Sequence, residues 1–147
     1  VSNPMIMAIV NGFVPVVCSI GIEVSRQGGA GEATGPRLLN VNADDAAAGV
    51  ARAIQASGGT VDALVLLTDV PGVLDAKKQR IDSLDAGAIE ALVRDGVVSG
   101  GMLVKVKAAH ATATALGTPV VIASGTDAAS LEALGRGTPT GTRILPR

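Results

Sequence analysis

The stretch Ala63-Leu64-Val65-Leu66-Leu67-Thr68-Asp69-Val70-Pro71-Gly72-Val73-Leu74 decides the fold class of this chain. Its first five residues are an aliphatic run with the length of a fully buried strand, and the run ends abruptly in a turn that contains Asp, Pro and Gly. In open parallel α/β sheets the ligand binds outside the carboxyl ends of the strands. The polar and glycine residues after Leu67 are therefore candidate site residues, although an ordinary strand exit would also explain such a turn taken alone.

Apolar runs and amphipathic segments alternate along the whole chain, with Gly and Pro between them. This alternation predicts a three-layer αβα sandwich around an open, mainly parallel sheet. We expect buried strands at 14–20, 63–67 and 119–123, and a last strand at 141–145. We expect helices at 5–10, 43–57, 85–95, 100–116 and 127–134, and a hairpin or exposed loop at about 22–41.

The composition restricts the possible functions. With 147 residues the chain can form one core, and because Phe13 is its only aromatic residue that core must be aliphatic. The net charge of −1 and the lack of Trp and Tyr argue against a nucleic-acid interface. No apolar run approaches the roughly 18 residues that a membrane span needs, and no signal-peptide pattern is present.

The single Cys and the single His narrow the chemistry further. Cys18 lies in an apolar segment, which predicts a buried and inert thiol. Because no intrachain disulfide is possible, we expect a cytoplasmic protein. His110 is the only His, which rules out a His-rich metal site, and its place in an Ala-rich segment predicts a surface position.

Three polar clusters lie where such a sheet would expose them: 40–45, 69–74 and 99–105. The first holds more Asn and Asp side chains than a helix cap needs. In the last, Gly100 and Gly101 precede a helix, whose backbone N–H groups and dipole favour an anion. Lys105 lies about one turn inside that helix, where a cation is unfavourable unless an anion offsets it. The combination indicates a phosphate site.

Several common nucleotide and hydrolase motifs are missing. The chain has no G-x-x-x-x-G-K-[ST] sequence and no G-x-G-x-x-G after a strand, which excludes P-loop and dinucleotide-binding interpretations. A Ser-His-Asp arrangement would require His110, which lies away from the three clusters.

Four stretches, taken in order, resemble the amino acid kinase family, and within it the acetylglutamate kinases of bacterial arginine biosynthesis. Their order and separation make the resemblance specific, and it runs from about Pro4 to the end of the chain. It is a resemblance to the C-terminal, ATP-binding half, so that residues 1–147 would form one nucleotide-binding lobe. The stretches are Asn40–Asp44, Leu66–Leu74, Gly101–Val106 and Gly141–Leu145.

The resemblance implies a role for each matching residue. Asn40 would hold the amino-acid substrate, Asp44 would orient the catalytic lysines, and Lys105 would stabilise the phosphoryl group during transfer. Other residues would border the nucleotide, the last three of them in the adenine pocket. These are Asp69, Val70, Pro71, Gly72, Val73, Leu74, Val97, Val98 and Ser99.

The activity that the resemblance implies is transfer of the γ-phosphoryl group of ATP to the side-chain carboxylate of N-acetyl-L-glutamate. Mg²⁺ would be held mainly through the nucleotide phosphates, and the full-length enzyme would be a homodimer. A carboxylate is already ionised at neutral pH, so the reaction needs positioning and charge neutralisation and no general base. The candidate clusters accordingly hold Lys, Asp, Asn and Gly but neither His nor Cys.

The chain departs from the family at two places. The Lys-x-Gly-Gly stretch, the acetylglutamate loop, a substrate-binding Arg and the dimer surface of the N-terminal lobe are absent, so the isolated chain is expected to be inactive. The loop at 25–36 is longer and richer in glycine than the family's hairpin. Three alternatives therefore stay open: a sister kinase for carrier-bound aminoadipate, carbamate or aspartate; a non-catalytic nucleotide- or metabolite-binding module; and a structural domain.

Overall fold

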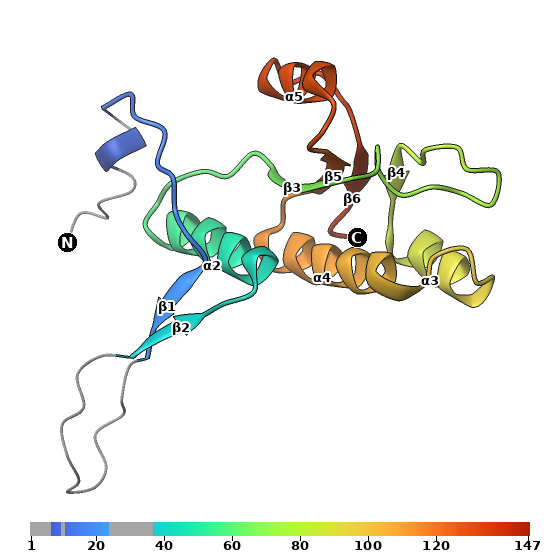
Figure 1. Cartoon of the computed structure of the whole chain (residues 1–147), viewed down its shortest axis with the longest axis horizontal. Helices are drawn as coiled ribbons and strands as arrows, with labels where there is room; N and C mark the ends of the chain where they lie inside the picture. Colours follow the sequence, from blue (N-terminus) through green and yellow to red (C-terminus); the bar gives the residue numbers. More distant parts are fainter. Residues whose placement is uncertain (1–6, 10, 24–36) are drawn as a thin grey trace, which may run out of the picture. The chain divides into compact units, whose positions relative to one another are not determined.

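The computed structural model of the chain describes residues 7–9, 11–23 and 37–147. The residues fall into two compact units, Val1–Gly59 and Thr60–Arg147, which we call the N-terminal unit and the C-terminal unit. Figure 1 shows the course of the chain through both units, which are described separately below.

The C-terminal unit is built on a four-stranded sheet with the order β3-β5-β6-β4. The strands are β3 (Leu64–Thr68), β4 (Ser83–Leu84), β5 (Val120–Ser124) and β6 (Thr142–Ile144). β3 pairs with β5 and β4 with β6 in parallel, whereas β5 and β6 are antiparallel. The prediction of an open, mainly parallel sheet is confirmed, although the two-residue strand β4 was not predicted.

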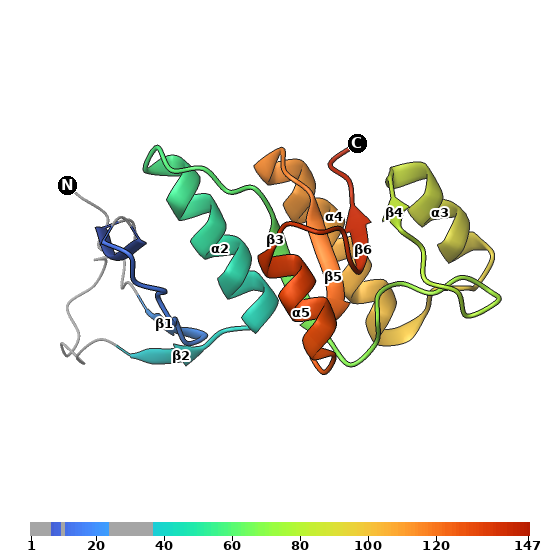
Figure 2. The same cartoon turned by 90° about the horizontal axis from the view of Figure 1, so that it is seen from above.

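Three helices complete this unit as an α/β fold. α3 (Ala86–Arg94) and α4 (Gly100–Leu116) lie on one side of the sheet, and α5 (Ala128–Gly135) lies on the other (Figures 1 and 2). Aspartate side chains cap two of these helices: the Asp85 carboxylate accepts a hydrogen bond from the Ala88 amide at the start of α3, and the Asp127 carboxylate accepts one from the Ala129 amide at the start of α5. Hydrogen bonds from the Ser130 hydroxyl and the Ala129 amide lower the pKa of the exposed Asp127 carboxyl.

The hydrophobic core lies between the sheet and the α3–α4 side. Ile122 of β5 and Ile144 of β6 are fully buried and pack with the apolar face of α4, which includes Val106 and Ala113. Small alanine side chains let the helix approach the strands closely, which suits a core that contains no aromatic residue. Among the described helices, none combines the length and the apolar character that crossing a membrane requires.

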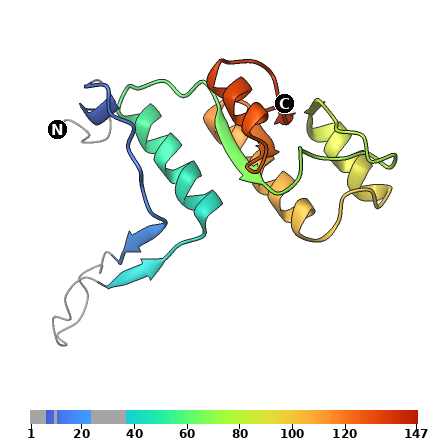
Figure 3. The ribbon, with the colours of Figure 1, turned by 45° about the horizontal axis from the view of Figure 1, so that its top comes forward.

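The N-terminal unit contains an antiparallel hairpin followed by a helix (Figure 3). β1 (Ile20–Ile22) pairs with β2 (Leu38–Asn40), and α2 (Ala43–Ala56) follows. The hairpin and the helix were predicted from the sequence. The glycine-rich loop at 25–36 lies outside the described residues. Of the helix predicted at 5–10, the structure describes residues 7–9, and these are helical.

The predicted buried strand at 14–20 is wrong. Only Ile20 belongs to a strand, and the side chains of Val14 and Val16 are 89% and 96% exposed. Cys18, predicted as a buried thiol, is exposed for the same reason. No described strand pairs with residues 14–17, so this apolar run has no neighbour against which to bury its side chains.

Two smaller expectations are also corrected. β3 is only partly buried, with Leu67 at 51% exposure, because β3 forms an edge of the described sheet. His110 is not a freely solvated surface residue. Its Nε2 atom is buried and has no hydrogen-bond partner among the described residues.

Candidate functional site

Two segments that are distant in sequence line one pocket of about 230 Å³ in the C-terminal unit. One segment follows β3 and the other precedes α4. The lining residues are Val70, Gly72, Leu74, Val97, Val98, Ser99 and Met102. All of them except Met102 belong to the set that the sequence predicted around a nucleotide, and the pocket lies beyond the carboxyl end of a strand, as predicted.

The first wall of the pocket is held by a short hairpin that follows Gly72. The Ile81 amide donates to the Val73 carbonyl at 2.9 Å, and the Asp75 amide donates to the Gln79 carbonyl at 2.8 Å. The Asp75 carboxylate also accepts from the Lys77 and Gln79 amides, each at 2.8 Å, and so closes the turn. These bonds fix the backbone on either side of Leu74, and the exposed residues Lys77 and Lys78 lie at the tip of this hairpin.

Gly72 cannot be replaced by another residue without strain. Its φ of +150° is rarely adopted by residues with a side chain, and a Cβ atom here would lie 2.6 Å from the Thr142 hydroxyl oxygen and 3.1 Å from the Thr142 amide nitrogen. The wall of the pocket therefore packs directly against β6.

The second wall is the connection between α3 and α4. The Val97 and Val98 amides both donate to the Leu92 carbonyl, at 3.0 and 3.3 Å, which turns the chain sharply after α3. Val98 is 5% exposed and belongs to the hydrophobic core, so core packing holds this wall in place. Ser99 then begins α4 as its N-cap residue.

The N-terminus of α4 is open to a ligand. The Ser99 side chain makes no capping hydrogen bond. Gly100 has a φ of +56°, which favours glycine, and a Cβ atom at Gly100 or Gly101 would meet no heavy atom within 4 Å. The first turn of α4 thus lies beside the pocket without a side-chain cap, an arrangement that favours an anion.

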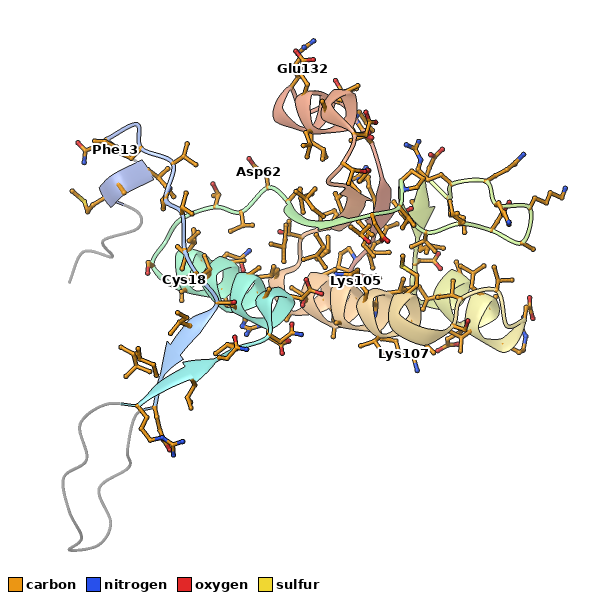
Figure 4. The ribbon with its side chains drawn as sticks, in the orientation of Figure 1. Phe13, Cys18, Asp62, Lys105, Lys107 and Glu132 are labelled. Carbon is orange, nitrogen blue, oxygen red and sulfur yellow. The ribbon has the colours of Figure 1, made fainter. Side chains whose placement is uncertain are left out.

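Lys105 and Lys107 both lie on α4 but differ in their surroundings. Lys105 is half-buried, whereas Lys107 is exposed. Figure 4 shows the two side chains on different sides of the helix. Lys105, the lysine expected to act on the phosphoryl group, is therefore the more enclosed of the two.

The predicted acceptor-side residues belong to the N-terminal unit. Asn40 ends β2, and Asp44 lies in the first turn of α2. The cap of α2 is Asn42, whose side-chain oxygen accepts from the Asp44 and Asp45 amides at 2.9 and 3.2 Å. The Asp44 side chain is therefore not the cap of α2. An acidic residue in the first turn also suits the helix dipole.

Some predicted residues do not line the pocket, and one lining residue was missed. Asp69 is exposed and accepts a hydrogen bond from the Thr68 hydroxyl, Pro71 is exposed, and the side chain of Val73 is fully buried in the core. Met102 was not predicted, because an apolar residue in the first turn of a helix usually indicates core packing. The signal that could have found it is its spacing of three residues from Ser99, since positions three apart share a helix face.

A larger pocket of about 440 Å³ lies in the N-terminal unit, between residues 9–19 and α2. Its lining is almost entirely apolar and includes Pro15, Val17 and Ile54 but no charged residue. None of its lining residues belongs to the set predicted around a nucleotide, so we assign the candidate site to the smaller pocket beside α4.

Comparison with known proteins gives the family. Residues 3–124 match the model of the amino acid kinase family. The chain belongs to this family. The match includes the stretch after β3, the connection before α4 and Lys105, and it ends at the last residue of β5.

The chain is also similar to several solved structures. The smu.665 protein of Streptococcus mutans UA159 is 26% identical with a TM-score of 0.65, over 98% of this chain and 47% of that one. N-acetylglutamate synthase from Neisseria gonorrhoeae, complexed with coenzyme A and L-arginine, is 20% identical with a TM-score of 0.72, over 98% and 30%. Carbamate kinase from Giardia lamblia bound to AMP-PNP is 27% identical with a TM-score of 0.55, over 79% and 40%. The chain thus spans less than half the length of these structures.

We predict that Gly72→Ala lowers the free energy of unfolding by about 1 to 3 kcal/mol, because it forces a strained backbone and a clash with Thr142. Urea denaturation followed by circular dichroism measures this. Gly87→Ala is the control: Gly87 lies in α3, where a Cβ atom would come no closer than 3.6 Å to another atom. That variant should keep its stability or gain up to about 1 kcal/mol from helix propensity. Equal stability of the two variants would contradict the tight packing at Gly72.

Proposed function

We propose that this chain is the ATP-binding part of a phosphotransferase that transfers the γ-phosphoryl group of ATP to the side-chain carboxylate of N-acetyl-L-glutamate. The observation that carries the proposal is the pocket beside α4, because two separate segments of the family's sequence pattern meet there. In a member of the amino acid kinase family, the simplest occupant of such a pocket is the adenine of a nucleotide.

The shape and chemistry of the pocket support an adenine ring. Its volume of about 230 Å³ is below the range of about 300–1,000 Å³ for complete ligands, so it suits one part of a nucleotide. Valine, leucine and methionine side chains offer flat apolar contact without any aromatic stacking. Backbone groups at both walls would supply the polar contacts that distinguish one base from another.

The open N-terminus of α4 and Lys105 support a phosphate position next to that ring. Backbone N–H groups and the helix dipole would bind the phosphates, and the Lys105 ammonium would offset the charge that develops during transfer. No group of three or more His, Cys, Asp or Glu side chains in the described ranges could hold a metal ion. Mg²⁺ would accordingly enter with the nucleotide and be held mainly by its phosphates.

The proposal also assigns roles to the residues that would bind the acceptor and arrange the active site. Asn40 would bind the amino-acid substrate, and Asp44 would orient the lysines of the active site. We also propose that the rest of the acceptor site and the dimerisation surface lie in a lobe outside this chain, because the chain spans less than half the length of its structural relatives. The enzyme would act in the cytoplasm.

Two alternatives have support of their own. The resemblance to a carbamate kinase bound to AMP-PNP favours a nucleotide but leaves room for carbamate or another acceptor. The fold is shared with an N-acetylglutamate synthase, so a lobe of this shape also occurs in a protein that is not named as a kinase. A non-catalytic nucleotide-binding module is therefore the second candidate.

We predict that the 147-residue chain binds ADP with Mg²⁺ weakly and does not catalyse transfer alone, because the nucleotide pocket is formed by this chain and the acetylglutamate loop is not part of it. Calorimetry with ADP and Mg²⁺ tests binding. A hydroxamate assay for an acyl phosphate, with ATP and N-acetyl-L-glutamate, tests turnover. Failure to bind ADP would overturn the nucleotide assignment, and turnover by the chain alone would overturn the assignment of the acceptor site to another lobe.

Lys105→Ala should lower kcat by roughly 10²- to 10³-fold in the enzyme that includes the acceptor-binding lobe, because it removes charge stabilisation in the transition state. Lys105→Arg should not restore full activity, since a planar guanidinium places its charge differently from a compact ammonium. The matched control is Lys107→Ala, an exposed lysine two residues further along α4, which should stay within a few-fold of wild type. If the Lys107 variant loses activity and the Lys105 variant keeps it, the phosphate position is assigned to the wrong side of α4.

Asp44→Asn should lower kcat by roughly 10²-fold or more in the same enzyme, with a smaller change in the KM for ATP, if the carboxylate orients a lysine. If Asp44 serves only the dipole of α2, the variant should keep its kcat and lose about 0.3–1 kcal/mol of stability. Steady-state kinetics and thermal denaturation of the same preparation separate these outcomes. Asp45→Asn, in the same helical turn, is the control for a pure dipole effect.

A further inference from the structure

Thr142 is a buried polar residue that the proposed chemistry does not use. It lies in β6 with 0% exposure, and its hydroxyl makes two short hydrogen bonds. The hydroxyl oxygen accepts from the Val73 amide at 2.8 Å, and the hydroxyl O–H donates to the Ile81 carbonyl at 2.6 Å. Both partners belong to the hairpin that forms the first wall of the pocket.

The hydroxyl takes the place of a backbone hydrogen bond in that hairpin. In an antiparallel pair of the hydrogen-bonded type, the two residues exchange both N–H···O bonds. Val73 and Ile81 make only one of them, from the Ile81 amide to the Val73 carbonyl at 2.9 Å. The Thr142 oxygen lies between the other donor and acceptor and bridges them. The base of the hairpin is thereby opened and attached to β6.

This attachment controls the position of the pocket wall. Val73 lies between Gly72 and Leu74, and both of these line the pocket. Gly72 also packs against Thr142, with a Cβ position only 2.6 Å from the hydroxyl oxygen. A shift of the Val73 backbone would therefore move two lining residues together.

We infer that Thr142 is a positioning residue for the nucleotide pocket, which acts through the Val73 amide without touching the nucleotide. The inference rests on the proposed function of the pocket. Only a side chain that both accepts and donates a hydrogen bond satisfies Val73 and Ile81 at once. Serine keeps that ability, whereas valine has nearly the same shape as threonine and leaves both backbone groups buried and unpaired.

The test compares ADP binding and local protection by NMR in the 147-residue chain, with Mg²⁺ present. Thr142→Val should weaken ADP binding by about tenfold and speed the exchange of the Val73 amide proton, because the wall loses its attachment. Thr142→Ser should stay within about threefold of wild type. Ile144→Val, two residues along β6 and fully buried, should lower thermal stability without changing ADP affinity, which separates positioning from general destabilisation.

The outcomes distinguish this inference from the proposed function. If the wild-type chain binds no ADP, the nucleotide assignment fails. If the wild-type chain binds ADP and a folded Thr142→Val variant binds it equally well, the positioning role is overturned. Should the valine variant not fold, Thr142→Ala takes its place. An alanine variant that binds ADP as tightly as the serine variant overturns the inference as well.

Discussion

β5 is enclosed by the rest of the C-terminal unit, and the arrangement of that unit depends on this enclosure. All five of its residues are buried, with β3 along one edge, β6 along the other, and helices on both faces of the sheet. Because β3 runs parallel to β5 with Thr68 opposite Ser124, both strands end at the same edge of the sheet. The chain must leave β3 there, and the pocket forms from that exit. The packing of one aliphatic strand thus determines where polar chemistry is possible.

Much of this unit could be predicted because strong local signals agree with the tertiary structure. Gly100 and Gly117 mark the two ends of α4, and the aliphatic run before Ser124 is typical of a strand buried at the centre of a sheet. That the segments at 70–74 and 97–99 line one pocket could be predicted only from the family's sequence pattern, since no local signal relates two loops more than twenty residues apart. The bridge made by Thr142 could not have been predicted, because a threonine in a strand pattern normally indicates β propensity and not a hydrogen bond to a distant hairpin.

The errors have a common physical origin. The segment at 14–17 has the aliphatic content of a strand, but this content describes the preference of the side chains and not the presence of a neighbouring strand. Leu67 shows the same effect on a smaller scale, since an edge strand leaves part of an apolar run exposed. Sequence patterns therefore located the element that is surrounded on all sides more reliably than elements at an edge.

The extended segment Val14-Pro15-Val16-Val17 has a practical consequence for work with the isolated chain. Its β-branched side chains are exposed, and no described strand pairs with its backbone, so it presents the features on which chains associate by strand addition. Pro15 acts as a partial gatekeeper because it lacks an N–H group and interrupts a continuous ladder. Concentrated samples should accordingly lose material to β-rich aggregates through this segment, and a charged residue in place of Val16 should improve solubility.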